Sequence, residues 1–68
     1  MVMNDVFSSN ISKIGYDSGT LHVIFNNGSY YTYSNVPEGL YIGLMLAASK
    51  GSYFARNIKS NYSFTRIR

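Results

Sequence analysis

The sequence predicts an α+β fold in which an antiparallel β-meander of three strands, or four, carries two helices packed on one face. Three observations support this prediction. Apolar and polar residues alternate between residues 11 and 33, as they do in half-buried strands. Clusters of Asn, Asp, Ser and Gly separate the alternating runs and have the chemistry of tight turns. After Pro37 the apolar spacing changes from two residues to three and four, which is typical of a helix.

The first two strands are predicted in ISKIGYDSGTLHVIF, residues 11–25. Apolar residues of the first run lead into Asp17-Ser18-Gly19, which is a turn sequence. The second run then places apolar side chains at every second residue: Leu21, Val23 and Phe25. This period of two favours a strand over a helix.

The turn before the third strand, SYYTYS at residues 29–34, decides which way its tyrosines point. A shift of register by one residue turns every side chain of a strand to the other face. A two-residue loop, Asn27-Gly28, would pair Phe25 with Tyr30. It would place Tyr31 and Tyr33 on the face that holds His22 and Ile24.

We expect the alternative, a three-residue loop over residues 26–28 in which Gly28 is left-handed. This register would pair Val23 with Tyr31 and Leu21 with Tyr33. It collects the larger apolar face, which a domain this small needs for its core. Tyr30 then points outward.

The longer helix is predicted after Pro37, which suits the first helical position because its missing N–H needs no partner there. Leu40 and Leu44 repeat at helical spacing, and we expect them to face the sheet. The helix is apolar nearly all round, so Tyr41 or Met45 should be partly exposed, or buried by a second copy.

A shorter helix and a final extended segment complete the predicted fold. Ser49 or Ser52 would cap the helix, which carries Tyr53, Phe54 and Ile58. The closing YSFTRIR alternates in polarity and predicts a terminal strand, or an extended segment that returns to the sheet.

Length and composition predict one folded domain over residues 1–68, with residues 1–7 as a loosely ordered N-terminal segment. The chain is 46% hydrophobic and 13% charged, a composition unlike that of disordered proteins. It has no cysteine, so neither a disulfide nor a thiolate zinc site can supplement the core. No run approaches the roughly 18 apolar residues of a membrane span, and no signal peptide is recognisable, so we expect a cytoplasmic protein without membrane contact.

The residues of catalysis and metal binding are scarce. The chain has one histidine, His22, and three carboxylates, and none of these pairs at a ligand spacing such as His-x-x-x-His. His22 is most simply an outward-facing strand residue. We therefore expect no enzymatic activity, no cofactor and no metal site.

Charge is distributed unevenly along the chain, whose net charge is +3. All three acidic residues lie in the first 38 positions. Five basic residues follow Ala48 with no acidic residue among them: Lys50, Arg56, Lys59, Arg66 and Arg68. Such a region could attract phosphates, an acidic protein surface or anionic lipid, or it could serve only as a solubilising surface.

Short motifs in a fixed order resemble the KTSC domain family, which is named after a segment at the C-terminus of some lysyl-tRNA synthetases and also occurs as small bacterial and phage proteins. The motifs are SSNISKIGYD, LHVIF before NGS, the Tyr-x-Tyr of Tyr31 and Tyr33, VPEGLYIGL, SKGSYF before RNI, and the final Y-x-F-x-RI. The similarity covers the chain from Ser8 onward. It departs from the family pattern at Ser63, where a proline between two tyrosines is expected. The resemblance implies a module for which RNA binding has been suggested.

Two functions follow as expectations. The first is binding of RNA or another single-stranded nucleic acid by one positive face formed by Lys50, Arg56, Lys59, Arg66 and Arg68, with the outward ring of Tyr30 stacking on a base. In this interpretation Tyr31 and Tyr33 belong to the core, although they could instead form the stacking surface. The second is a protein-interaction module, for example a phage protein that docks on a host protein, or a homo-oligomer.

Overall fold

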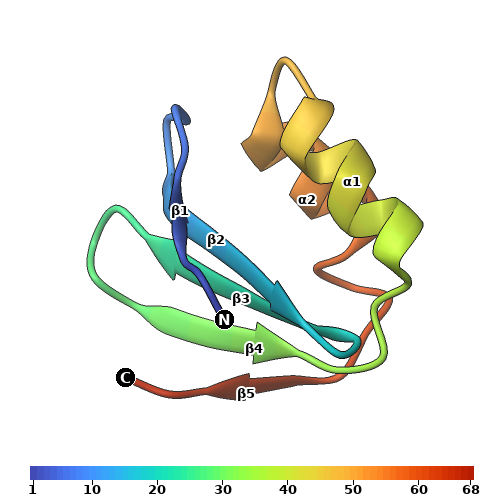
Figure 1. The fold of residues 1–68 in the computed structure, drawn as a ribbon. Coiled ribbons are helices and arrows are strands. Elements are labelled where there is room, and N and C mark those ends of the chain that lie inside the picture. The colour runs from blue at the N-terminus through green and yellow to red at the C-terminus, as the bar shows by residue number, and fades with distance from the viewer.

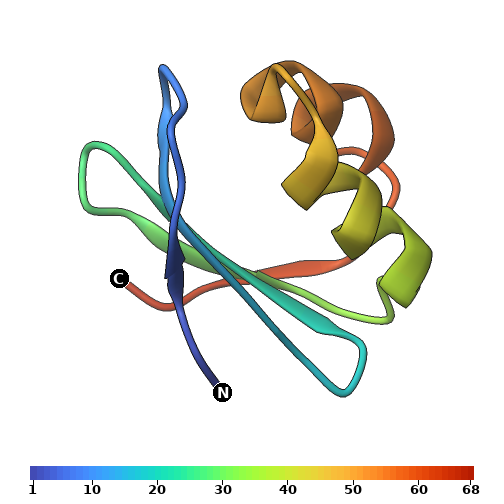
Figure 2. The same cartoon turned by 45° about the horizontal axis from the view of Figure 1, so that its top comes forward.

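The computed structural model describes residues 1–68 and shows a five-stranded antiparallel sheet with two helices over one of its faces (Figure 1). The strands lie side by side in their sequence order: β1 (Asn4–Asp5), β2 (Ile11–Asp17), β3 (Thr20–Phe25), β4 (Tyr30–Tyr33) and β5 (Phe64–Arg66). The helices are α1 (Glu38–Leu46) and α2 (Lys50–Asn57), and Figure 2 shows both on the same side of the sheet. The predicted α+β class is confirmed, with more strands than the three or four expected.

The two additional strands lie at opposite edges of the sheet. At one edge the closing segment pairs as β5 with β4, so it is a strand and not merely extended. At the other edge Asn4 and Asp5, which the sequence placed in a loosely ordered segment, pair as β1 with β2. An ion pair at 2.6 Å between Asp5 Oδ1 and Lys13 Nζ joins these two strands. Backbone hydrogen bonds with β2 hold β1 in place. They do not require alternating apolar residues, so the sequence of β1 shows no strand pattern.

The pairing of β3 with β4 has the register that the three-residue loop predicts. The pairs include Val23 with Tyr31 and Leu21 with Tyr33. Gly28 has a φ of 90°, and the Phe25 N–H closes the loop by donating to the Ser29 carbonyl at 2.8 Å. A left-handed glycine after Asn26-Asn27 is therefore what sets the direction of every side chain on β4.

The core lies between the sheet and the two helices. Its nine buried residues come from every layer of the fold: Ile11, Ile14, Leu21, Val23, Tyr33, Val36, Leu44, Phe54 and Ile58. Burial of these side chains removes apolar surface from water and is the main force that holds a domain of this size together.

The helices differ in how they contact this core. Leu44 of α1 is fully buried, as expected, whereas Leu40 is only partly buried. Tyr41 is partly buried because its ring stacks on Tyr16 of β2, with ring centroids 4.8 Å apart. Of the two predicted caps of α2 it is Ser49 that caps the helix, and its hydroxyl accepts a hydrogen bond from the backbone N–H of Ser52.

Candidate functional site

An open pocket of about 460 Å³ lies between the β4–β5 end of the sheet and α2. Five aromatic residues line it: Phe25, Tyr31, Tyr33, Phe54 and Phe64. Polar and small residues complete the lining: Asn10, Asn27, Ser29, Gly51, Ala55, Lys59 and Ser60. An apolar floor with a polar rim is the usual form of a small-ligand site.

The register of the sheet brings the aromatic rings together. Tyr31 and Tyr33 alternate on β4, so both point toward the helices, and Phe64 pairs with Tyr33 across β4 and β5. The Tyr33 ring packs edge-on against Phe54 of α2 at 5.2 Å, and Phe64 lies 5.7 Å from Tyr31, between ring centroids. The rings therefore form one continuous aromatic surface.

Exposure increases along this surface from the core to the edge strand. Tyr33 is only 4% exposed, Tyr31 is half-buried and Phe64 is 60% exposed. Burial raises the pKa of the Tyr33 hydroxyl, and the nearby Tyr31 adds to that rise. Tyr33 is thus a core residue, whereas Phe64 is accessible to a ligand and Tyr31 is only partly accessible.

Of the predicted basic residues, Lys59 lines this pocket and Arg66 lies beside it, over the ring of Tyr31. Arg66 pairs with Tyr31 across β4 and β5, and its guanidinium carbon lies 5.8 Å from the centre of the Tyr31 ring. This is within the range of a cation–π interaction. Lys59 lines the pocket from the turn after α2 and is exposed. One positive side chain therefore lines the pocket and a second lies beside it.

The other predicted site residues lie elsewhere. Tyr30 is on the opposite face of the sheet, where its hydroxyl lies 2.7 Å from His22 Nδ1, and Arg68 lies over its ring at 5.6 Å. Lys50 donates from Nζ to the Ala47 carbonyl at the start of α2.

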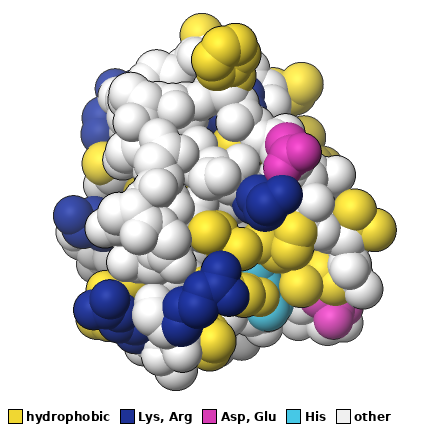
Figure 3. All heavy atoms as spheres, turned by 90° about the vertical axis from the view of Figure 1, so that its left-hand side faces the viewer, with side chains coloured by type: hydrophobic (Ala, Val, Ile, Leu, Met, Phe, Trp, Pro, Cys, Tyr) yellow, Lys and Arg dark blue, Asp and Glu magenta, His cyan; other side chains and the backbone are white.

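Arg56 is exposed on α2 and follows the buried Phe54 by two residues. It therefore projects about 200° round the helix from that ring. The five basic side chains do not share one face, and Figure 3 shows basic groups at several separate places on the surface it displays.

The sequence identified the basic residues but not the pocket. It assigned Tyr31 and Tyr33 to the core and chose Tyr30 as the stacking ring. The buried position of Tyr33 agrees with that assignment, but Tyr31 is only half-buried. The alternation of Phe64 and Arg66 in the closing segment is the signal that could have indicated the site.

No group of three His, Cys, Asp or Glu side chains lies close enough to hold a metal ion. Neither helix has the length and apolarity to cross a membrane.

Comparisons with known proteins identify similar chains. The model of the KTSC domain family matches residues 7–62. The crystal structure of the KTSC domain protein YPO2434 from Yersinia pestis is 36% identical in sequence and superposes with a TM-score of 0.91. That similarity covers 98% of this chain and 97% of the other. None of the curated proteins compared with the chain matches it.

Proposed function

The chain belongs to the KTSC domain family, and we propose that it is a small non-enzymatic module that binds RNA or another nucleic acid as a single strand in the aromatic pocket. The observation that carries this proposal is the arrangement at the sheet edge. The accessible ring of Phe64 lies beside a tyrosine that is covered by an arginine, with Lys59 on the same pocket rim.

Stacking would supply the first part of the binding energy. Unpaired bases stack on aromatic side chains with little regard to sequence, and each such contact is worth about 1–3 kcal/mol. Phe64 offers an exposed ring for this purpose, and the half-buried Tyr31 lies next to it. A base within a duplex has its faces covered by its neighbours, so this form of recognition favours single strands.

Phosphate contacts would supply the second part. Lys59, which lines the pocket, and Arg66, which lies over Tyr31, would contact the phosphates of a strand that enters it. Two contacts to a single strand predict a log–log salt slope of roughly −1.4, because each phosphate contributes about 0.7. This is a weak electrostatic contribution, so affinity would depend chiefly on stacking.

A titration with labelled oligonucleotides tests the proposal. Fluorescence anisotropy would be measured with single-stranded RNA, single-stranded DNA and duplex DNA over a series of potassium chloride concentrations. We expect both single strands to bind more tightly than the duplex, with a shallow salt slope. Absence of binding to every oligonucleotide at low salt would exclude this function.

A protein-interaction module is the second candidate, and one observation favours it. Ile42 and Leu46 lie one turn apart on α1, away from the core, and are 50% and 80% exposed. Exposed apolar pairs of this kind are often contact sites. Sedimentation equilibrium over a range of concentrations would detect self-association through α1, and Leu46→Glu should abolish it.

A further inference from the structure

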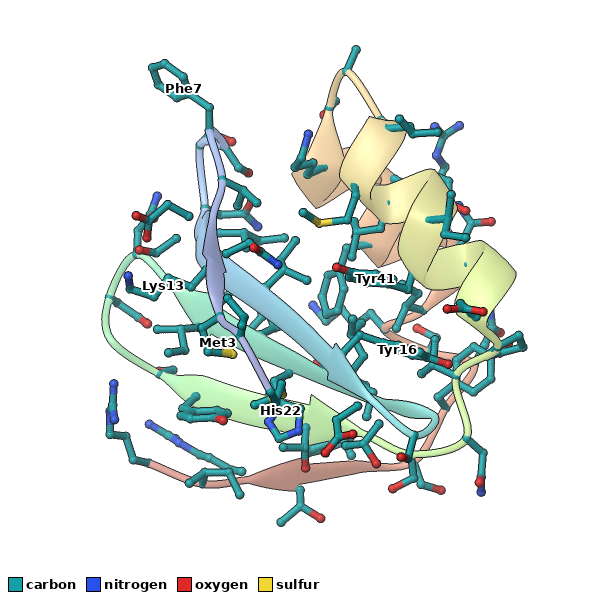
Figure 4. The ribbon with its side chains drawn as sticks, in the orientation of Figure 1. Met3, Phe7, Lys13, Tyr16, His22 and Tyr41 are labelled. Carbon is teal, nitrogen blue, oxygen red and sulfur yellow. The ribbon has the colours of Figure 1, made fainter.

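The face of the sheet away from the helices is partly covered by the N-terminal segment, whose role the proposed pocket does not explain. Met1 is exposed and Met3 is half-buried, and both side chains reach Gly15 of β2. Gly15 is buried although it points away from the core, because these methionines cover it. Figure 4 shows Met3 and His22 near the N-terminus of the chain, apart from Tyr16 and Tyr41 below α1.

The absence of a side chain on Gly15 allows the two thioethers to converge. A Cβ at this position would lie 2.5 Å from Met3 Sδ and 3.1 Å from Met1 Sδ. Both sulfur atoms are therefore close to one point above the sheet. Two sulfur atoms that bind one ion with bonds of about 2.3 Å must lie within roughly 4.6 Å of each other, and small rotations of these flexible side chains can reach that geometry.

His22 supplies a nitrogen on the same face. It pairs with Gly15 across β2 and β3, so its side chain rises from the sheet beside the two sulfur atoms. Its Nδ1 is engaged by the Tyr30 hydroxyl at 2.7 Å, which leaves Nε2 for another partner. A histidine that is oriented by a hydrogen bond at one nitrogen and free at the other has the arrangement of a metal ligand.

We propose that Met1 Sδ, Met3 Sδ and His22 Nε2 form a binding site for a soft monovalent cation, Cu(I) or Ag(I). Thioether sulfur and imidazole are donors that such ions prefer. The donor set contains no carboxylate or thiolate, so a monovalent ion leaves less uncompensated charge in the site than a divalent ion would. Sequence motifs for metal sites are built from His, Cys and carboxylate residues and do not include methionine. The sequence alone therefore does not indicate this site.

Harder cations do not fit this site. Calcium and magnesium require several oxygen ligands, usually carboxylates. The nearest carboxylate along the chain is that of Asp5 on β1, and Lys13 already binds it at 2.6 Å. The backbone carbonyl of Val2 also lies near Gly15, at 3.1 Å from the position of its Cβ, and is a single uncharged oxygen.

Methyl NMR of the full chain in chloride-free buffer, titrated with silver nitrate, tests the proposal. Intact mass spectrometry first establishes that the sample retains Met1. The chain has three methionines, so Met45 on α1 is an internal control. The methyl signals of Met1 and Met3 and the ring signals of His22 should shift together and saturate at one equivalent of silver. A shift of Met45 alongside them would indicate non-specific thioether binding and overturn the proposal.

Affinity measurements with variants provide a second readout. Met3→Leu and His22→Gln should each weaken silver binding by at least about tenfold, whereas Met45→Leu should leave it unchanged. Gly15→Ala removes no ligand but occupies the space between the sulfur atoms, and should also weaken binding. Tyr30→Phe removes the hydrogen bond to His22 and should weaken binding by about 10–100-fold.

Unchanged affinity in both Met3→Leu and Gly15→Ala, each shown to be folded by circular dichroism, would refute the site. Magnesium at the same concentration should produce no shift of the Met1 or Met3 methyl signals. Phe64→Ala should bind silver normally. The metal site can therefore be refuted without refuting the nucleic-acid site, and the reverse also holds.

Discussion

Tyr33 and Phe64 face each other across β4 and β5, yet Tyr33 is 4% exposed and Phe64 is 60% exposed. The difference arises because β5 is the edge strand, so the outer side of the Phe64 ring has no neighbouring strand to cover it. One aromatic pair therefore combines a core residue with an accessible ring, and mutations can separate the two roles.

Stability should depend on Tyr33 far more than on Phe64. Tyr33→Ala removes a buried ring and should lower the free energy of unfolding by about 3–5 kcal/mol. Phe64→Ala removes an exposed ring and should cost less than about 1 kcal/mol. Urea denaturation followed by circular dichroism measures both. Equal losses would mean that β5 belongs to the core.

Nucleic-acid binding should depend on Phe64, although stability should not. Phe64→Ala should weaken binding of single-stranded RNA by about 1–3 kcal/mol, because one stacking platform is lost. Leu46→Ala, which truncates an even more exposed apolar side chain on α1, is the control and should have no effect. A similar loss in both variants would assign the change to non-specific apolar contact.

The salt dependence of binding should report which cations touch phosphate. Replacing Lys59 with Gln should reduce the magnitude of the log–log slope by about 0.7. Arg56→Gln removes a charge of the same sign from the exposed side of α2 and should leave the slope unchanged. An equal change in the two variants would indicate that only net charge matters.

Substitutions of two glycines should change stability in opposite directions. Gly28 has a φ of 90°, which an alanine adopts only with strain, so Gly28→Ala should cost about 1 kcal/mol or more. Gly39, in the first turn of α1, has open space around its Cα, so Gly39→Ala should stabilise the protein by up to about 1 kcal/mol. Thermal unfolding of both variants checks the signs. A stabilising Gly28→Ala would disprove the left-handed loop.

Alkaline pH should destabilise the fold through Tyr33. Its pKa is raised in the folded protein by burial first and by Tyr31 second. The folded state therefore holds this proton more tightly than the unfolded state, whose value is near 10.0. The resulting stability is fully present below pH 10 and is lost as the pH rises through the folded pKa. Tyr33→Phe should flatten this loss in urea titrations at increasing pH, and an unchanged loss in that variant would contradict the prediction.

Local sequence patterns were sufficient for the central part of the fold. The register of β3 and β4 follows from a left-handed glycine and from the need to bury Leu21 and Val23, both of which are visible within a few residues. The strand β1 was not predictable in this way. Asn4 and Asp5 carry no apolar pattern, and backbone hydrogen bonds with β2 form their strand.

The site could be predicted only in part, because its geometry depends on pairing between distant segments. Arg66 lies beside the pocket because it pairs with Tyr31, although both helices separate these two residues in the sequence. Strand alternation would place Arg68 on the same face of the sheet as Arg66, but it lies on the other face. The N–H groups of Ile67 and Arg68 both donate to the Tyr30 carbonyl, so two residues oppose one, as in a β-bulge. This irregularity places Arg68 on the outer face, over Tyr30.

The position of β5 also has a kinetic consequence. Short connections join the strands from β1 to β4, whereas β5 must close a loop that runs from Tyr33 to Phe64 before it can pair with β4. Loop closure of this length costs conformational entropy, so β5 should dock late in folding and detach early, with the fastest hydrogen exchange of the pocket strands. Its detachment would remove Phe64 and Arg66 together, so fraying of one short strand could release a bound ligand while the core stays folded.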